Sequence, residues 1–159
     1  MILEKKEYVS ISDAAEIFGI REENLFNLEN QGIIDFDYNY NINILDVQAI
    51  IRVGLDYVLN EKNIDRKEKI RQQIKQIKER RDKRFYEMNN NDNVKEMFLP
   101  TGNIDNIQLQ IFNADEDSFN IECEGTLKNC LLRLNEIMKE EKGEILEYQI
   151  ISVIGKNIF

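Results

Sequence analysis

The sign of the charge changes twice along this chain of 159 residues. Residues 1–60 carry a net charge of −7, residues 61–97 carry +4, and residues 98–159 carry −6. Steps of this kind are typical of boundaries between structural units. We therefore expect three units: an acidic N-terminal module, a basic helical connector and an acidic C-terminal module.

The residue types that are missing limit the chemistry of the chain. It has no histidine, so Ser–His and Cys–His catalysis and histidine-ligated metal sites are excluded. Two cysteines and no signal peptide favour a reducing cytoplasm over a disulfide scaffold. No apolar run approaches the roughly 20 residues of a membrane span. We expect a cytoplasmic binding or regulatory protein without metal or cofactor, and not an enzyme.

Apolar residues recur at helical spacing on both sides of Gly19. Ser10 or Ser12 can cap a first helix that ends near Phe18. Gly19 can adopt the left-handed conformation of a tight turn, after which a second helix begins. The pattern predicts a helix-turn-helix over residues 11–30. Ala15 is the small residue at which the two helices are expected to cross, and the second helix is expected to bury Leu25 and Leu28.

This unit continues into a segment with few regular features and then into a new helix from Leu45. Residues 8–53 resemble the winged helix-turn-helix of the MerR-like and excisionase-like DNA-binding families. The resemblance implies that the second helix reads DNA and that a following helix joins two copies as a homodimer. The positions that match the scaffold of these families are Ala14, Ala15, Gly19, Ile20, Leu25, Glu29, Gly32, Ile33 and Ile34.

The sequence departs from these families where they touch DNA. Phe26 replaces an arginine of the second helix, Asn27 and Leu28 replace two aromatic residues, and the wing at 35–43 has no cation. Lysine and arginine contacts to phosphate supply most non-specific affinity for a duplex. An N-terminal module of net charge −7 should therefore be repelled by DNA at long range.

Two interpretations follow for the exposed side of the second helix. In the first, it reads base edges, and asparagine suits bidentate contact with adenine. In the second, Phe26, Tyr38 and Tyr40 form an aromatic patch on an acidic surface, which suits a protein partner with basic rims. A third possibility is that Phe26 packs in the core against the next helix. In the first interpretation, the residues that would read DNA are Arg21, Asn24, Asn27 and Asn30.

The connector holds the one cationic stretch that could meet phosphates. From Lys62 to Arg84 there are eleven cations and four anions, and one or two long helices are predicted between Leu45 and Met88. Ile70, Ile74 and Ile77 fall on one side, as in the seam of a coiled-coil dimer. Such a dimer would place two second helices about 34 Å apart in successive major grooves. The predicted phosphate contacts are Lys67, Lys69, Arg71, Lys75, Arg80, Arg81 and Arg84.

Two other interpretations of these cations stay open. A run of charges on a helix is often only a solvated face. Alternatively, the cations hold the acidic modules of the same chain or of another copy, because opposite net charges on either side of the connector attract each other.

The C-terminal module has the pattern of a small sheet covered by one helix. Apolar and polar residues alternate over 107–111 and over 119–123, which predicts two strands. Thr126 can cap a helix, and a last strand is predicted from about Ile145 to Ile154. The expected order is β-β-α-β, after a polar break at 89–93.

Two possible sites in this module favour a structural interpretation. Asn113, Asp115, Asp117 and Glu124 have calcium-loop spacing, but Ser118 stands where that loop requires glycine, so we expect a hairpin turn. Cys123 and Cys130 lie on apolar faces, where thiols behave as small hydrophobic groups.

The sequence as a whole predicts an α+β protein with a winged helix-turn-helix (1–60), a coiled-coil connector (61–97) and an α+β interaction module (98–159). It favours a small DNA-binding regulator, of the transcription-regulator type, that dimerises through the connector. The alternative is a protein-binding adaptor or inhibitor, for example of phage or mobile-element origin, that keeps the scaffold without binding DNA.

Overall fold

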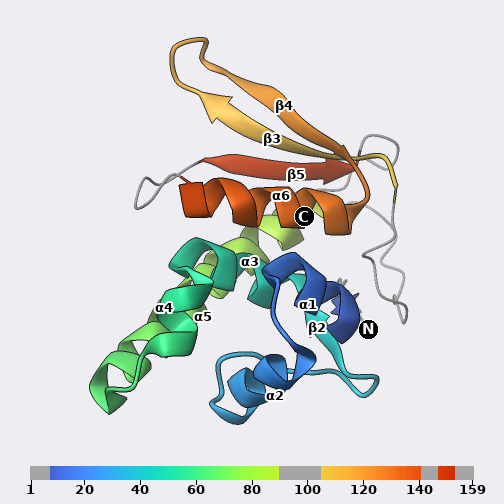
Figure 1. The fold of residues 1–159 in the computed structure, drawn as a ribbon. Helices are drawn as coiled ribbons and strands as arrows, with labels where there is room; N and C mark the ends of the chain where they lie inside the picture. The colour runs from blue at the N-terminus through green and yellow to red at the C-terminus, as the bar shows by residue number, and fades with distance from the viewer. Residues whose placement is uncertain (1–7, 90–104, 141–146, 153–159) are drawn as a thin grey trace.

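The computed structural model describes residues 8–89, 105–140 and 147–152 as a mixed α+β fold (Figure 1). A layer of helices from the N-terminal and middle parts of the chain lies beneath one C-terminal helix, and a three-stranded sheet lies above that helix. The α+β class predicted from the sequence is confirmed.

The two helices predicted around Gly19 are present. Strand β1 (Tyr8–Ser10) leads into α1 (Ile11–Phe18), and α2 (Glu22–Asn30) follows a three-residue turn. Ser10 caps α1, since its Oγ accepts a hydrogen bond from the backbone N–H of Asp13 at 3.0 Å. Gly19 has a φ of +67°, the left-handed conformation that glycine adopts at low cost. Strand β2 (Asn41–Asn43) then pairs antiparallel with β1.

The middle of the chain forms three helices instead of the one or two expected. Helix α3 (Ile44–Val53) ends at Gly54, whose φ of +104° breaks the helical path, and α4 (Leu55–Asn60) follows directly. A corner at residues 61–63 then turns the chain into α5 (Ile64–Asn89). The side chain of Asn63 caps α5 by accepting from the N–H of Arg66 at 3.1 Å.

The predicted coiled-coil seam is covered within the chain itself. Ile70 and Ile74 are only 1% and 2% exposed, and Ile77 packs partly buried against the same core. Helix α5 lies against α3, which presents apolar side chains on most of its circumference. Apolar periodicity identifies the buried side of a helix but not the element that covers it. In this fold the stripe predicted as a dimer seam packs against α3 of the same chain, so the coiled coil is not confirmed.

The C-terminal module has the predicted β-β-α-β order. Strands β3 (Ile107–Asn113), β4 (Ser118–Gly125) and β5 (Tyr148–Ser152) form an antiparallel sheet in the order β4-β3-β5, with a bulge in the pairing beside Leu109. Helix α6 (Leu127–Glu140) is capped by Thr126, whose Oγ1 accepts from the N–H of Asn129. It buries one side against the sheet.

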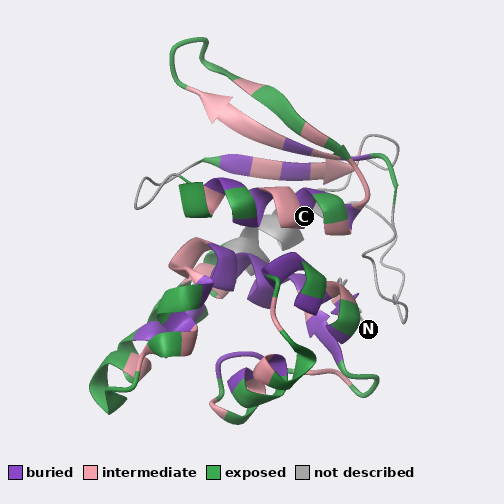
Figure 2. Ribbon diagram, viewed as in Figure 1, coloured by how far each residue is buried: buried purple, intermediate pink, exposed green. Residues whose placement is uncertain are grey.

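Helix α6 also joins the C-terminal module to the N-terminal one. It packs on α1 and α3, so that buried residues of both modules form one continuous core (Figure 2). Asn135 donates from Nδ2 to the carbonyl oxygen of Ile17 at 3.2 Å, and Lys128 forms ion pairs with Asp13 and Glu16 on α1. The expected boundary near residue 60 falls at the corner before α5, and the one near residue 97 lies outside the described residues.

A buried hydrogen bond offers a test of this shared core. The hydroxyl of Tyr148 on β5 donates to Oε1 of Gln48 on α3 at 2.7 Å. Tyr148→Phe should lower the free energy of unfolding by about 1–2 kcal/mol, because the Gln48 amide loses a partner away from water. Urea denaturation followed by circular dichroism measures this. A single transition is expected, and separate transitions for two modules would contradict the shared core.

Candidate interaction surface

Three aromatic rings meet on the exposed side of α2. Leu25 and Leu28 anchor this helix in the core, which turns Phe26 outward with 40% of its surface exposed. Its ring lies 5.2 Å from that of Phe36 and 6.1 Å from that of Tyr40, between centroids, and the last two are 6.3 Å apart. We call these three residues the aromatic patch. Because 40% of its surface is exposed and it is not part of the buried core, the interpretation of Phe26 as a core residue is wrong.

The loop beside the patch is held by one carboxylate. Asp37 accepts hydrogen bonds from the backbone N–H groups of Asn39 and Asn41, at 2.9 and 2.7 Å, and from the side chain of Asn41. At the tip of this loop Tyr38 is fully exposed, and Tyr40 has a φ of +60°, which is unusual for a bulky residue. A fixed loop thus presents aromatic side chains to solvent, an arrangement often found at functional sites.

The structure brings together two of the three predicted patch residues and adds one that the sequence did not single out. Phe26 and Tyr40 are in contact, whereas Tyr38 extends beyond them at the loop tip. Phe36 joins the patch because the chain folds back on itself, and Phe36 forms a β-bridge with Ile42. Its position depends on the path of the loop, so no periodic pattern could have revealed it. Only its location two residues before Tyr38, within a short aromatic-rich segment, hints at a shared surface.

The surroundings of the patch are acidic. Glu22 and Glu23 occupy the first turn of α2, one turn from Phe26, and both are exposed. Asp35 is exposed next to Phe36. Acidic side chains around aromatic rings favour a partner that carries basic groups around an apolar anchor.

The residues predicted to read DNA lie on the same helix. Arg21 precedes α2 and is exposed, as are Asn27 and Asn30, whereas Asn24 is half-buried. The exposed face of α2 therefore presents one cation, two amides, two carboxylates and the ring of Phe26.

The predicted phosphate contacts divide into three groups. Arg71 is engaged within the chain: Nε donates to the carbonyl oxygen of Gln31 at 2.8 Å, and Nη1 pairs with Glu68 at 2.9 Å. Lys69, Lys75 and Arg80 are exposed, and Lys67 is half-buried; none of these four forms an ion pair with a side chain that the structure describes. The side chains of Arg81 and Arg84 lie outside the described part.

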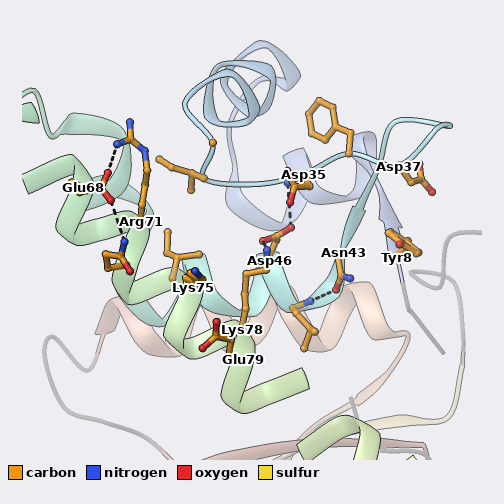
Figure 3. Close-up of a pocket in the computed structure, with 16 residues that line it drawn as sticks. Tyr8, Asp35, Asp37, Asn43, Asp46, Glu68, Arg71, Lys75, Lys78 and Glu79 are labelled. Carbon is orange, nitrogen blue, oxygen red and sulfur yellow. Dashed lines mark hydrogen bonds and ion pairs between the residues drawn. The ribbon is translucent and has the colours of Figure 1, made fainter. Parts of the chain in front are cut away.

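A groove of about 590 Å³ separates α5 from the segment that follows α2 (Figure 3). Phe36 lines it, so the groove is continuous with the aromatic patch. At its base Asp46 accepts a hydrogen bond from the N–H of Asp35 at 3.3 Å and pairs with Lys78 of α5 at 2.7 Å. Burial raises the pKa of Asp46 above its usual value, although the nearby ammonium group of Lys78 opposes this.

The groove carries both signs of charge. Its buried carboxylate is occupied by Lys78, which fixes α5 against α3. Among the described residues, no group of three or more potential ligands could hold a metal ion.

The segment with calcium-loop spacing forms the predicted hairpin turn, and one of the two cysteines is buried. Asn113 Oδ1 accepts from the N–H groups of Asp115 and Glu116, which closes the β3–β4 turn. Cys130 is buried beneath the sheet, and burial raises the pKa of its thiol to about 12, so the thiol stays protonated at neutral pH.

Comparison with known proteins gives no relative for this chain. No family model, no curated protein and no solved structure matches it. Within the described residues, every helix is too short or too polar to cross a membrane.

Proposed function

We propose that this chain is a protein-binding adaptor or inhibitor that keeps a helix-turn-helix scaffold and contacts its partner through the aromatic patch. The observation that carries the proposal is the cluster in which the exposed rings of Phe26 and Tyr40 meet the half-buried ring of Phe36 on an acidic surface. Aromatic residues at the centre of an interface often dominate its binding energy.

The charge of this region favours a protein over a nucleic acid. Residues 1–60 carry a net charge of −7, and the wing that would lie near phosphates presents Asp35 and Asp37 instead of cations. Aromatic rings within an acidic border suit an apolar anchor flanked by lysine or arginine. The groove beside Phe36 gives such a flanking cation a place near Asp35.

Phe26→Ala should weaken partner binding about 30-fold, which corresponds to about 2 kcal/mol. It removes the ring that both other rings of the patch contact. Because the ring of Phe26 is 40% exposed and contacts the rings of Phe36 and Tyr40, its replacement should lower the free energy of unfolding by only about 1 kcal/mol. Isothermal titration of the isolated partner against wild type and variant measures the affinity.

The partner itself can be identified by photo-crosslinking from position 38. A photoreactive phenylalanine analogue replacing the fully exposed Tyr38 should give a covalent adduct with one protein in cells, and Phe26→Ala should abolish the adduct. The matched control places the analogue at Lys139, exposed near the end of α6. Equal capture of the same protein from both positions, or an unchanged affinity of Phe26→Ala, would argue against the patch as the binding surface.

A DNA-binding regulator is the second candidate function. Arg21 and Asn27 are exposed on α2, and Arg71 holds cation-bearing α5 beside the end of that helix. Fluorescence anisotropy with duplexes from the region upstream of its own coding sequence, and with a scrambled control, tests this at about 50 and 200 mM salt. Specific binding that falls steeply with salt and is lost in Arg21→Ala supports the regulator. Absence of binding at the lower salt supports the protein-binding function.

A further inference from the structure

Two surfaces of the molecule have opposite charge. The β3–β4 hairpin, residues 105–125, contains six acidic residues and no cation. Residues 62–80 contain eight cations and three acidic residues. Charge complementarity of this size steers association and selects partners.

The sheet presents an apolar strip within this acidic hairpin. Leu109 is fully buried toward α6, so its neighbour Gln110 and the residues paired with it lie on the opposite face. Ile121, opposite Gln110, is 57% exposed, and the rings of Phe112 and Phe119 are in edge contact at 5.3 Å. We call Gln110, Phe112, Phe119 and Ile121 the outer sheet face.

The corner between α4 and α5 presents an apolar side chain among charges of both signs, at the start of the cationic helix α5. Ile64, the first residue of α5, is 80% exposed, and its exposed neighbours include Lys62, Asp65 and Arg66. Tyr57 on α4 is also largely exposed. We call Tyr57, Lys62, Ile64 and Arg66 the α5 corner. Isolated apolar side chains need no explanation, but here one lies where the cationic helix α5 begins and another lies within the acidic hairpin, and interfaces bury apolar residues of this kind.

The two surfaces lie at opposite ends of the molecule: the α5 corner is at the lower left of Figure 1 and the β3–β4 turn is at the top. One chain therefore does not bring them together. We propose that the outer sheet face of one copy binds the α5 corner of a second copy, with Ile64 seated beside Ile121 and the cations of α5 facing the acidic hairpin. Such a contact joins two different surfaces, so it continues from copy to copy as a ring or an open chain.

Sedimentation velocity of the full chain tests this contact. The sedimentation coefficient should rise with concentration up to about 100 μM at about 50 mM salt, and less so at about 300 mM salt, because salt screens exposed charges. Ile121→Thr and Ile64→Ser should each weaken association at least about tenfold. Both residues are exposed, and Ile121→Thr keeps the branched side chain that strands favour.

Mixing the two variants is the decisive experiment. Each variant keeps one intact surface, so an equimolar mixture should form a one-to-one complex with wild-type affinity, although each variant alone associates at least about tenfold more weakly. Tyr38→Ser removes an equally exposed ring outside both surfaces and should associate as wild type does. A wild-type chain that stays monomeric at about 100 μM and low salt overturns the proposal. So does full association of Ile64→Ser alone, which would mean that two sheet faces bind each other.

Discussion

Replacement of Ile74 by alanine is expected to lower the free energy of unfolding by about 3 kcal/mol. Ile74 is 2% exposed where α5 packs on α3, so truncation leaves a cavity in the core of a single chain. Urea denaturation at two protein concentrations measures the effect. At about 300 mM salt, where association through exposed charges is weakened, the midpoint should fall in the variant and should not depend on concentration, because the lost contacts lie within one chain.

Ile64→Ala is the matched control for Ile74→Ala, since it removes a similar side chain from the exposed start of the same helix. It should change stability by less than about 0.5 kcal/mol. If Ile70, Ile74 and Ile77 formed a coiled-coil seam between two copies, the urea midpoint of the wild type would rise with protein concentration. The Ile74→Ala variant would then lose this dependence on concentration. That result would contradict the packing of α5 on α3.

Local signals in the sequence predicted the elements well, because they act over a few residues. Ser10 and Gly19 define the ends of α1 through a side-chain cap and a left-handed turn. Alternation around Leu109 and Ile121 gave β3 and β4, since side chains of a strand point alternately to its two faces. These features depend on backbone geometry and do not require knowledge of the partner element.

Packing between distant elements could not be predicted in the same way. The stripe of Ile70 and Ile74 is compatible with a contact to a second copy or to another helix of the same chain, because the sequence does not say which surface covers a helix. One signal was present: α3 has apolar residues around most of its circumference, which is typical of a helix covered on several sides. That pattern could have indicated that α3, not another α5, receives the stripe.

The candidate site could be predicted only in part, because the position of one of its residues depends on the path of a loop. Phe26 and Tyr40 could be grouped because both lie in segments that the resemblance assigns to the exposed side of one module. Phe36 was missed because its place depends on the loop that Asp37 closes. The cations of α5 look alike in the sequence, yet Arg71 is bound to Gln31 and Lys78 to Asp46, whereas Lys75 is exposed and unpaired among the described side chains.

Lys78→Met is expected to lower the free energy of unfolding by about 2–3 kcal/mol at pH 7. The side chain of Asp46 is 1% exposed, so removal of the ammonium group leaves a buried carboxylate without its cation. The value is at the lower end of the usual range because Lys78 is partly exposed, with 29% of its side chain in contact with solvent. Methionine keeps most of the apolar stem, so lost packing contributes little.

The loss in Lys78→Met should depend on pH with a definite sign. Burial already raises the pKa of Asp46 above 3.8, and loss of Lys78 removes the attraction that opposes this rise. Because the native pKa of Asp46 is raised, the folded state binds a proton more readily than the unfolded state does. The loss in free energy of unfolding caused by Lys78→Met is therefore largest above the native pKa of Asp46, and it shrinks as the pH falls toward 3.8. Urea denaturation at pH 7, 5 and 4 measures this trend.

The double variant Asp46→Asn, Lys78→Met should regain most of the stability at pH 7, since it removes both charges and keeps an oxygen that can accept from the N–H of Asp35. A deficit that is equal at all three pH values, or that persists in the double variant, would mean that Lys78 stabilises α5 by packing and not by its charge.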